Sequence, residues 1–564
     1  MQGQANTSQT IAKRDPALVM RLSRLGSFHQ SRLSFMRILI RRMTRENWTF
    51  SRPVFDFDDK GVGHAVYCAH TPDRTYSLIA FGHDLPAEQR SDRVIAQAWD
   101  STFTLFDGVP DADDVARLRQ NIPLQEAGRV SEKELSVSRA NRSVRLWDHV
   151  VSALAAGQQP DPSEIAKVGY LMRTTAVYGS GKLGAADHEM IAGRPECAAP
   201  FQIEMLSVFL TRTYVRDLVQ HVADLRSGKA AATLDPAIAC SLGIGNSTGL
   251  GMAPFLINHP MLFNNWIAAR EQAIAIVRNL PTATDAEIKV FRALLERSQV
   301  SADIWHSAHE VQIEKLKHLR SDLSKLADHV AEADLHAAQP WNRLFQWAEA
   351  TLGEDAQECL ASLLLEPYGQ LVDPLSDQML DRNTQAFRID GTMRVGELRA
   401  ILQRAYRWAL DIDWSEQQQY ARAWYVSAEK LEPRLGERFD EPIAAYEQPL
   451  APGRDAAALF HDLKGKDADA TLAAFLLAHP RHRHSVRRAQ IVATAPYAEI
   501  RDNTIGSDLM PIDMLRCKLS FFGATHFDPR SDRWVRICMF SNAPYPEELA
   551  TADEFWPYPA MARP

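Results

Sequence analysis

Two glycine-rich stretches hold the residue types in this sequence that could do chemistry. The first runs from Tyr178 to Arg194 and the second from Gly243 to His259. Glycines at this density let the backbone approach a ligand closely, and the exposed amides of such turns can bind an anion. The two stretches therefore predict a binding site for a carboxylate or phosphate group.

The polar side chains of these stretches indicate how such a ligand would be held and converted. Lys182 and Arg194 would supply positive charge to the anion. The neutral donors would be Tyr178, Ser180, Asn246, Ser247, Thr248 and Asn258. His188 or His259 would transfer the proton, with Asp187 orienting the histidine beside it. Donors and charge of this kind also stabilise a developing oxyanion.

Known nucleotide-binding motifs do not account for the two stretches. Gly179-Ser-Gly-Lys182 has too few residues before its lysine for a Walker A loop, and Leu183 stands where Ser or Thr is required. The second stretch follows no convincing strand and lacks the dinucleotide-binding glycine spacing, which argues against a Rossmann fold. The alternative is that these glycines end helices within long structural connections. We favour ligand binding, because long loops inside compact proteins are usually functional.

A histidine-bearing segment offers a second kind of site. Its side chains include pairs three and four residues apart, which could ligate a metal ion from one face of a helix. These side chains are Asp303, His306, His309, Glu310, Glu314 and His318. No matching Glu-x-x-His set occurs elsewhere, so we assign no metal ligands and keep a metalloenzyme as an alternative function. The sequence leaves open whether an organic cofactor binds.

The N-terminal region is basic although the whole chain carries a net charge of −8. Residues 16–48 predict a helix interrupted near Gly26. Its second half has an apolar face made by Leu33, Met36, Ile40 and Met43. The rest of that half is occupied by Arg32, Arg37, Arg41, Arg42 and Arg45. A non-enzymatic scaffold that docks a partner through this helix is therefore a further alternative, beside simple packing of its apolar face within the protein.

The elements around these segments predict a mainly α protein of the α+β class. Residues 49–85 have β-branched and aromatic runs separated by DDKG and TPDR, which is typical of an antiparallel meander. Residues 518–541 predict a C-terminal hairpin. We therefore expect a multi-helix core with a small antiparallel sheet, built from the N-terminal meander and extended by the hairpin if the two meet.

Four regions follow from this pattern. They are a basic tail and amphipathic helix over 1–48, a small β region over 49–110, a large helical domain over 111–480 that contains both glycine-rich stretches, and a C-terminal α/β region over 481–564. The predicted helices span 131–156, 162–177, 200–227, 260–279, 284–300, 302–336, 340–352, 354–366, 394–411, 415–430 and 455–478.

Composition narrows the function classes. Hydrophobic residues make up 46% and charged residues 24% of the chain, which is ordinary for a packed globular protein. The 71 acidic residues outnumber the 63 basic ones, which argues against a nucleic-acid-binding protein. None of the six cysteines lies within ten residues of another, the N-terminus lacks an apolar signal region, and no apolar run could span a bilayer. We therefore expect a soluble cytoplasmic protein.

These observations favour an enzyme over the alternatives, with its reaction class left open. Its substrate would be a small anionic metabolite held by the two glycine-rich stretches, with Lys, Arg and Asn stabilising the anion and a histidine acting as general acid or base. Besides this ligand, a second copy of the chain could bind through helical surfaces.

Overall fold

A large mixed β-sheet organises the N-terminal half of the protein and also takes up strands from the C-terminus. The computed structural model describes residues 11–89, 98–121, 131–175, 191, 193–228, 231–249, 260–379, 388–415, 425–427, 433–434, 447–449, 451–501, 511–528 and 534–558. Within these ranges nine strands form one sheet in the order β1-β2-β3-β4-β5-β6-β7-β12-β11. The strands are β1 (Thr49–Phe57), β2 (Gly63–His70), β3 (Thr75–Gly82), β4 (Ser101–Asp107), β5 (Glu134–Arg142), β6 (Tyr170–Thr174), β7 (Gly243–Gly249), β12 (Trp534–Met539) and β11 (His526–Asp528).

The prediction of a small sheet is wrong. Three strands in its middle, β5, β6 and β7, occupy segments that the sequence pattern assigned to helices or to a glycine-rich loop. In β5 the apolar Leu135 and Val137 alternate with Ser136 and Ser138, which is the period of a strand. The helical pattern begins only at α4 (Trp147–Ala155). In β7 the glycines allow close packing, because a Cβ on Gly245 would lie 2.6 Å from ring atoms of Tyr170 on β6.

One neighbouring pair in the sheet is parallel. Strands β1 to β6 pair antiparallel in sequence order, and β12 pairs antiparallel with both β7 and β11. Strands β6 and β7 run parallel. Parallel neighbours need a long crossover, and here it contains α7 (Gln202–Ser227) and α8 (Pro236–Ser241).

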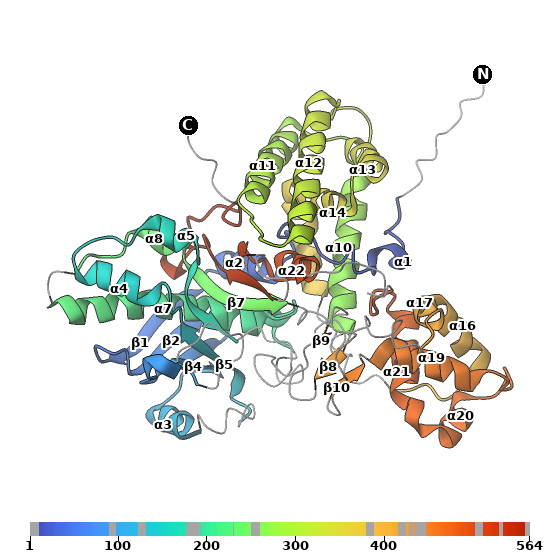
Figure 1. Cartoon of the computed structure of the whole chain (residues 1–564), viewed down its shortest axis with the longest axis horizontal. Helices are drawn as coiled ribbons and strands as arrows, with labels where there is room; N and C mark the ends of the chain where they lie inside the picture. Colours follow the sequence, from blue (N-terminus) through green and yellow to red (C-terminus); the bar gives the residue numbers. More distant parts are fainter. Residues whose placement is uncertain are drawn as a thin grey trace.

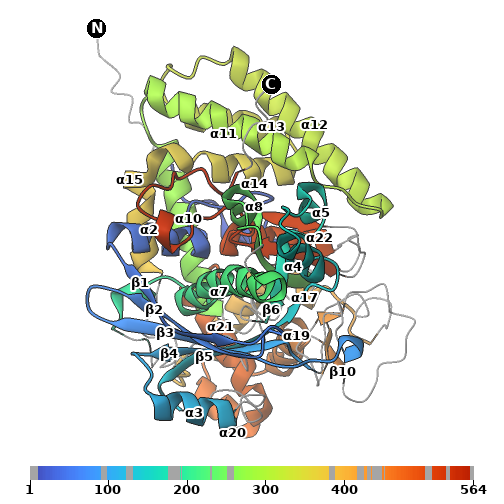
Figure 2. The same cartoon turned by 90° about the vertical axis from the view of Figure 1, so that its left-hand side faces the viewer.

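Helices cover both faces of the sheet, as Figure 2 shows. On one face lies α7, whose Tyr214 packs edge-on against Phe103 and Tyr67 of the strands. On the other face α3 (Ala112–Asn121) buries Leu118 against Ile79 and Phe106. The sheet is therefore a central layer, as its mostly buried strands require.

A group of long helices forms the upper part of Figure 1. It comprises α10 (Pro260–Arg278), α11 (Asp285–Asp303), α12 (Glu310–Glu332), α13 (Pro340–Thr351) and α14 (Glu354–Leu363). The leucine seam expected in this region lies on α12 and is buried against α11 and α14, at Leu316, Leu319, Leu323, Leu326 and Val330. The helix predicted over 302–336 is wrong at its start, because α11 ends at Asp303 and the chain turns before α12 begins.

A second helical cluster, at the lower right of Figure 1, has its own hydrophobic core. Its helices are α16 (Val395–Ala405), α17 (Arg407–Leu410), α19 (Ala451–Leu463), α20 (Leu472–Ala478) and α21 (Arg483–Thr494). A three-stranded sheet has the order β10-β8-β9, from β8 (Tyr425–Ser427), β9 (Pro433–Arg434) and β10 (Glu447–Pro449). Strand β8 contradicts the helix predicted over 415–430.

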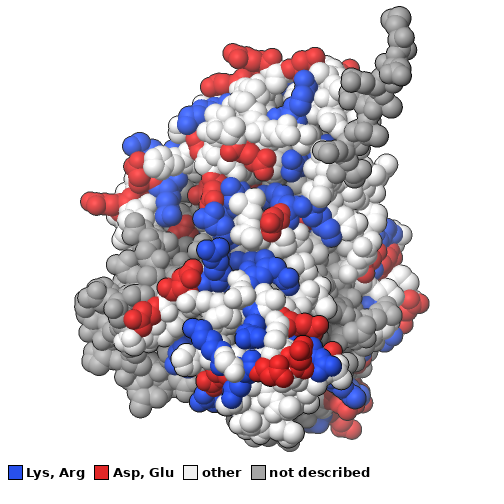
Figure 3. All heavy atoms as spheres, turned by 90° about the vertical axis from the view of Figure 1, so that its right-hand side faces the viewer, with Lys and Arg blue, Asp and Glu red and all other residues white. Residues whose placement is uncertain are grey.

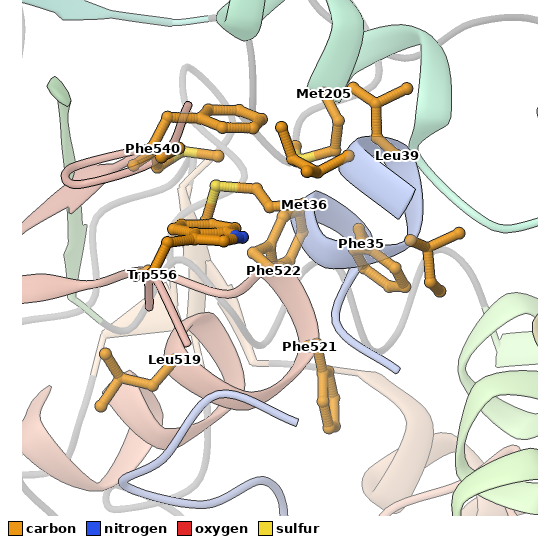
Figure 4. Packing of buried hydrophobic residues seen from close by; sticks show 14 of the residues in the cluster. Phe35, Met36, Leu39, Met205, Leu519, Phe521, Phe522, Phe540 and Trp556 are labelled. Atoms are coloured by element: carbon orange, nitrogen blue, oxygen red, sulfur yellow. The ribbon is translucent and has the colours of Figure 1, made fainter. Parts of the chain in front are cut away.

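The N-terminal segment is largely buried and only partly helical. Its helices are α1 (Pro16–Val19) and α2 (Phe35–Arg45), so the interruption expected near Gly26 is much longer than the prediction for 16–48 allowed. Between them the chain passes α22 (Pro511–Cys517) so closely that a Cβ on Gly26 would lie 2.5 Å from the Arg516 backbone. On α2, Phe35, Met36 and Leu39 point into a cluster with Phe522 and Met205 (Figure 4).

A buried charge cluster attaches this segment to the helices. Glu358 of α14 is surrounded by three arginines, Arg14, Arg24 and Arg270. Burial alone would raise the pKa of Glu358, but the arginines lower it to about 2. Arg14 also pairs with Glu271 at 2.7 Å. Charges in such a buried network are costly to leave unpaired, so the network fixes the path of the N-terminal segment.

Candidate functional site

The edge of the sheet where β6 and β7 end is the candidate site. Because the two strands are parallel neighbours, their carboxyl ends lie at the same edge. The first glycine-rich stretch follows β6, and residues 250–259 of the second follow β7. Ligands of α/β sheets bind outside the carboxyl ends of strands, where neighbouring connections diverge. β7 extends further in this direction than β6, because Thr174, the last residue of β6, lies beside Asn246 and β7 continues to Gly249.

Asn246 joins the end of β6 to the middle of β7. Its buried side-chain amide donates a hydrogen bond of 2.9 Å to the backbone oxygen of Thr174, the last residue of β6. Ser247 and Thr248 lie on β7 opposite Arg536 and Val535 of β12. These three predicted ligand-binding residues are therefore parts of a strand.

Arg194 lies beside the end of β4, several strands away from β6 and further along the sheet than the end of β6. Its Nη2 atom pairs with Asp107 at the end of β4 at 2.6 Å, and its Nη1 atom donates to the hydroxyl of Tyr76 on β3 at 3.3 Å. Burial lowers the pKa of Arg194, but the bonds to Asp107 and Tyr76 more than offset this and raise it. Thr174 is level with Ser101 of β4 and Gly82 of β3, so Tyr76 lies three strands across and six residues along the sheet, roughly 25 Å from Thr174. Arg194 would therefore reach only an extended ligand.

The remaining predicted site residues lie outside the described residues. They are Tyr178, Ser180, Lys182, Asp187, His188, Asn258 and His259. Their assignment as substrate-binding and proton-transfer groups stays a prediction.

Two buried hydroxyls on β5 belong to the inner face of the sheet. Ser136 and Ser138 pair with Leu105 and Phe103 of β4, and opposite residues of an antiparallel pair share a face. Phe103 contacts α7, which places both serines on the face that α7 covers. In the described part of the chain neither hydroxyl has a hydrogen-bond partner. Buried hydroxyls without partners are rare in proteins, and these two lie on the strand that neighbours β6.

Cys197, which lies close to His188 in the sequence, is a poor nucleophile. The side chain is buried in the short helix η3 (Pro195–Cys197), and burial together with Glu196 raises the pKa of its thiol to about 12. A thiol of this kind stays protonated at neutral pH and is inert.

Lys518 is a functional candidate that the sequence pattern did not reveal. It opens a π-helical turn, η10 (Lys518–Phe522), directly after α22, which packs on β7 and β12. The side chain is 1% exposed, and its Nζ atom lies 4.3 Å from the centre of the Phe522 ring. Burial lowers the pKa of Lys518 to about 7. Amines of this kind serve as bases or nucleophiles, and π-turns are frequent at functional sites.

One signal for Lys518 was present in the sequence. The residue is a lone charge in the otherwise apolar run Lys518-Leu-Ser-Phe-Phe-Gly523. We assigned this run to a hairpin strand, in which alternate side chains can face solvent. The structure places the hairpin at β11 and β12 instead, so the lysine falls in a buried turn.

The arginines of α2 are mostly buried and paired within the protein. Arg37 binds Glu366, with Nη2 donating to Oε2 at 2.8 Å. Arg32 binds Asp373 at 2.7 Å, and Arg42 pairs with Asp377 and Glu46. The partners of Arg32 and Arg37 follow α14 by a few residues, more than 300 positions along the chain.

An exposed basic surface lies elsewhere. Figure 3 shows Lys and Arg side chains gathered near the middle of the face that is on the right in Figure 1, where α16 and α17 lie. These helices expose Arg404 and Arg407. The predictions of a docked partner and of a homo-oligomer through helical surfaces stay predictions.

The described residues contain neither a metal-binding group nor a membrane-spanning helix. Among the described residues, no group of three or more His, Cys, Asp or Glu side chains is placed to hold a metal ion. His306 and His309 precede α12, while His318 on α12 lies 3.3 Å from Glu314. No helix in the described part of the chain combines the length and apolarity needed to cross a membrane.

Comparisons with protein-family models, with curated proteins and with solved structures found no match to this chain.

Proposed function

We propose that this protein is an enzyme that acts on a small anionic metabolite bound outside the carboxyl ends of β6 and β7. The observation that carries the proposal is the parallel pairing of these strands, because β6 is followed by the first glycine-rich stretch and β7 by residues 250–259. Backbone amides of such stretches can surround a carboxylate or phosphate group. The Asn246 bond to Thr174 supports this arrangement, because it fixes the end of β6 against the middle of β7.

The proposed chemistry is proton transfer to or from the bound anion. Lys182 would neutralise the anion, and His188 or His259 would act as general acid or base. Lys518 supports this proposal from the described part of the chain, because a buried amine with a pKa near 7 can accept and release a proton at neutral pH. We place the enzyme in the cytoplasm, a location that the six free cysteines support.

The first experiment is a thermal-unfolding screen of the full-length protein against phosphorylated and carboxylated metabolites. A ligand that raises the unfolding temperature would then be tested on Lys182→Ala and His259→Ala. We expect Lys182→Ala to weaken binding by about tenfold or more, which is the typical effect of losing one charged hydrogen bond. His259→Ala should reduce turnover more than binding.

The matched control is Lys60→Ala, because this lysine is 66% exposed and lies in the β1–β2 turn. It should bind the ligand like the wild type. Asn246→Ala should lower both binding and unfolding temperature, because it removes the bond to Thr174. Unchanged ligand affinity in Lys182→Ala and unchanged turnover in His259→Ala would refute the site assignment.

A further inference from the structure

A cavity of about 320 Å³ lies between α2, the 3₁₀ helix η6 (Asp373–Gln378) and the C-terminal residues 552–556. Four arginines of α2 line it, namely Arg37, Arg41, Arg42 and Arg45. Three of them follow at four-residue spacing, which places them on one helix face. Asp373, Glu554 and Trp556 line the opposite walls. The volume suits a small ligand.

Arg41 has spare hydrogen-bonding capacity in this cavity. Its Nη2 atom donates to the backbone oxygen of Arg32 at 2.6 Å and lies 3.4 Å from Asp373. Its Nη1 atom is 3.6 Å from a carboxylate oxygen of Glu554, which is too far for a hydrogen bond. Among the described residues this buried atom has no hydrogen-bond acceptor.

The charge around Arg41 is only partly neutralised. Burial lowers its pKa to about 10, and Arg32 and Arg37 contribute to the decrease, while Asp373 and Glu554 oppose it. By contrast, the pKa of Arg37 is raised, because Glu366 outweighs the effect of burial. An additional negative charge beside Arg41 would therefore stabilise its charged form.

We propose that this cavity binds a small oxyanion, a phosphate or carboxylate group, which accepts a hydrogen bond from Nη1 of Arg41. The site is separate from the proposed substrate site, because the described residues that line it include none from β6 or β7. Glu554 competes with the anion. Its carboxylate is 46% exposed and lies within 3.6–3.8 Å of Arg32, Arg37 and Arg41, so a bound oxyanion takes over part of its role.

Isothermal titration of the full-length protein with inorganic phosphate and with succinate, at constant ionic strength set with chloride, tests this proposal. Arg41→Gln should weaken oxyanion binding by about tenfold, as expected for a charge-assisted hydrogen bond. Glu554→Gln should strengthen it severalfold, because the variant removes the competing negative charge. Arg407→Gln is the matched control, since its side chain is 85% exposed and does not line the cavity, so it should change affinity by less than about twofold.

The two variants test the proposal in opposite directions, because Arg41→Gln should weaken oxyanion binding and Glu554→Gln should strengthen it. If Arg41→Gln does not fold, Glu554→Gln still tests oxyanion binding, because replacing a half-exposed carboxylate should leave the protein folded. Binding of phosphate alone or of succinate alone supports the site and identifies the preferred group. The proposal is overturned if neither anion binds to the wild type, if Arg41→Gln binds as tightly as the wild type, or if Glu554→Gln binds more weakly. Lys182→Ala should leave this binding unchanged, which separates the cavity from the substrate site.

Discussion

Replacing Lys518 by methionine is expected to stabilise the protein at neutral pH. The lysine is buried beside Phe522, and burial lowers its pKa from 10.5 to about 7. At about 1.4 kcal/mol for each tenfold change in proton affinity, this corresponds to an upper value of about 5 kcal/mol. Methionine has a similar length and no charge, so Lys518→Met should recover part of this free energy of unfolding.

The pH dependence follows from the two protonation equilibria. The unfolded chain keeps the Lys518 proton up to about pH 10.5, whereas the folded protein loses it near pH 7. Between these values the unfolded state binds more protons, so the stability of the wild type rises with pH. The advantage of Lys518→Met is therefore complete below pH 7 and shrinks as the pH approaches 10.5.

Thermal unfolding of both proteins at pH 6.5, 8 and 9.5 measures this difference. We expect the gap in unfolding temperature to narrow with rising pH, while the exposed control Lys60→Met stays parallel to the wild type. A Lys518→Met protein that is less stable than the wild type at pH 6.5, or a gap that does not change with pH, would refute the reasoning. A confirmed gap would also support a functional amine, because groups that reduce stability are often kept for activity.

Three further predictions concern the core. His29 is buried, which lowers its pKa to about 4, so wild-type stability should fall by about 3 kcal/mol as the pH drops from 6.5 to 4; acid unfolding of His29→Phe should lack this decrease. Glu358→Gln leaves three buried arginines without a full counter-charge and should cost about 3–5 kcal/mol in urea unfolding at pH 7. In the wild type the contribution of Glu358 is present above pH 4.5 and is lost as the pH falls toward 2. Gly245→Ala places a Cβ against the Tyr170 ring and should cost about 1–3 kcal/mol, whereas Gly353→Ala, in a more open position, should unfold within a few degrees of the wild type.

The long helices could be predicted from the sequence because their signals are local. Thr284 and Glu287 form the capping box that their spacing indicates, and α11 starts there. The N-terminal strands were recognisable from their turn sequences. Strand β7 was not, because a strand of glycine, asparagine and serine has low intrinsic strand propensity. It is a strand because β6 and β12 pair with it on both sides.

The candidate site was predictable only in part for the same reason. The glycine-rich stretches stand out by composition, but the second one begins with strand β7, whose place beside β6 depends on long-range pairing. The polar types of Asn246 and Arg194 suggested ligand contacts, whereas the structure gives both of them partners inside the protein. The arginines of α2 looked like a solvent-facing surface because their acidic partners are hundreds of residues away.

The position of β12 beside β7 determines when the sheet can be completed during synthesis. The ribosome delivers β1 to β7 early, but β12 emerges only after nearly the whole chain has been made. Until then β7 is an open edge, which in other proteins invites pairing with a foreign strand. Its many glycines make it a poor template for such aggregation. A nascent chain with an incomplete sheet is therefore protected from aggregation through β7 until β12 is made. A chain that ends before residue 534 would keep β7 as an open edge permanently.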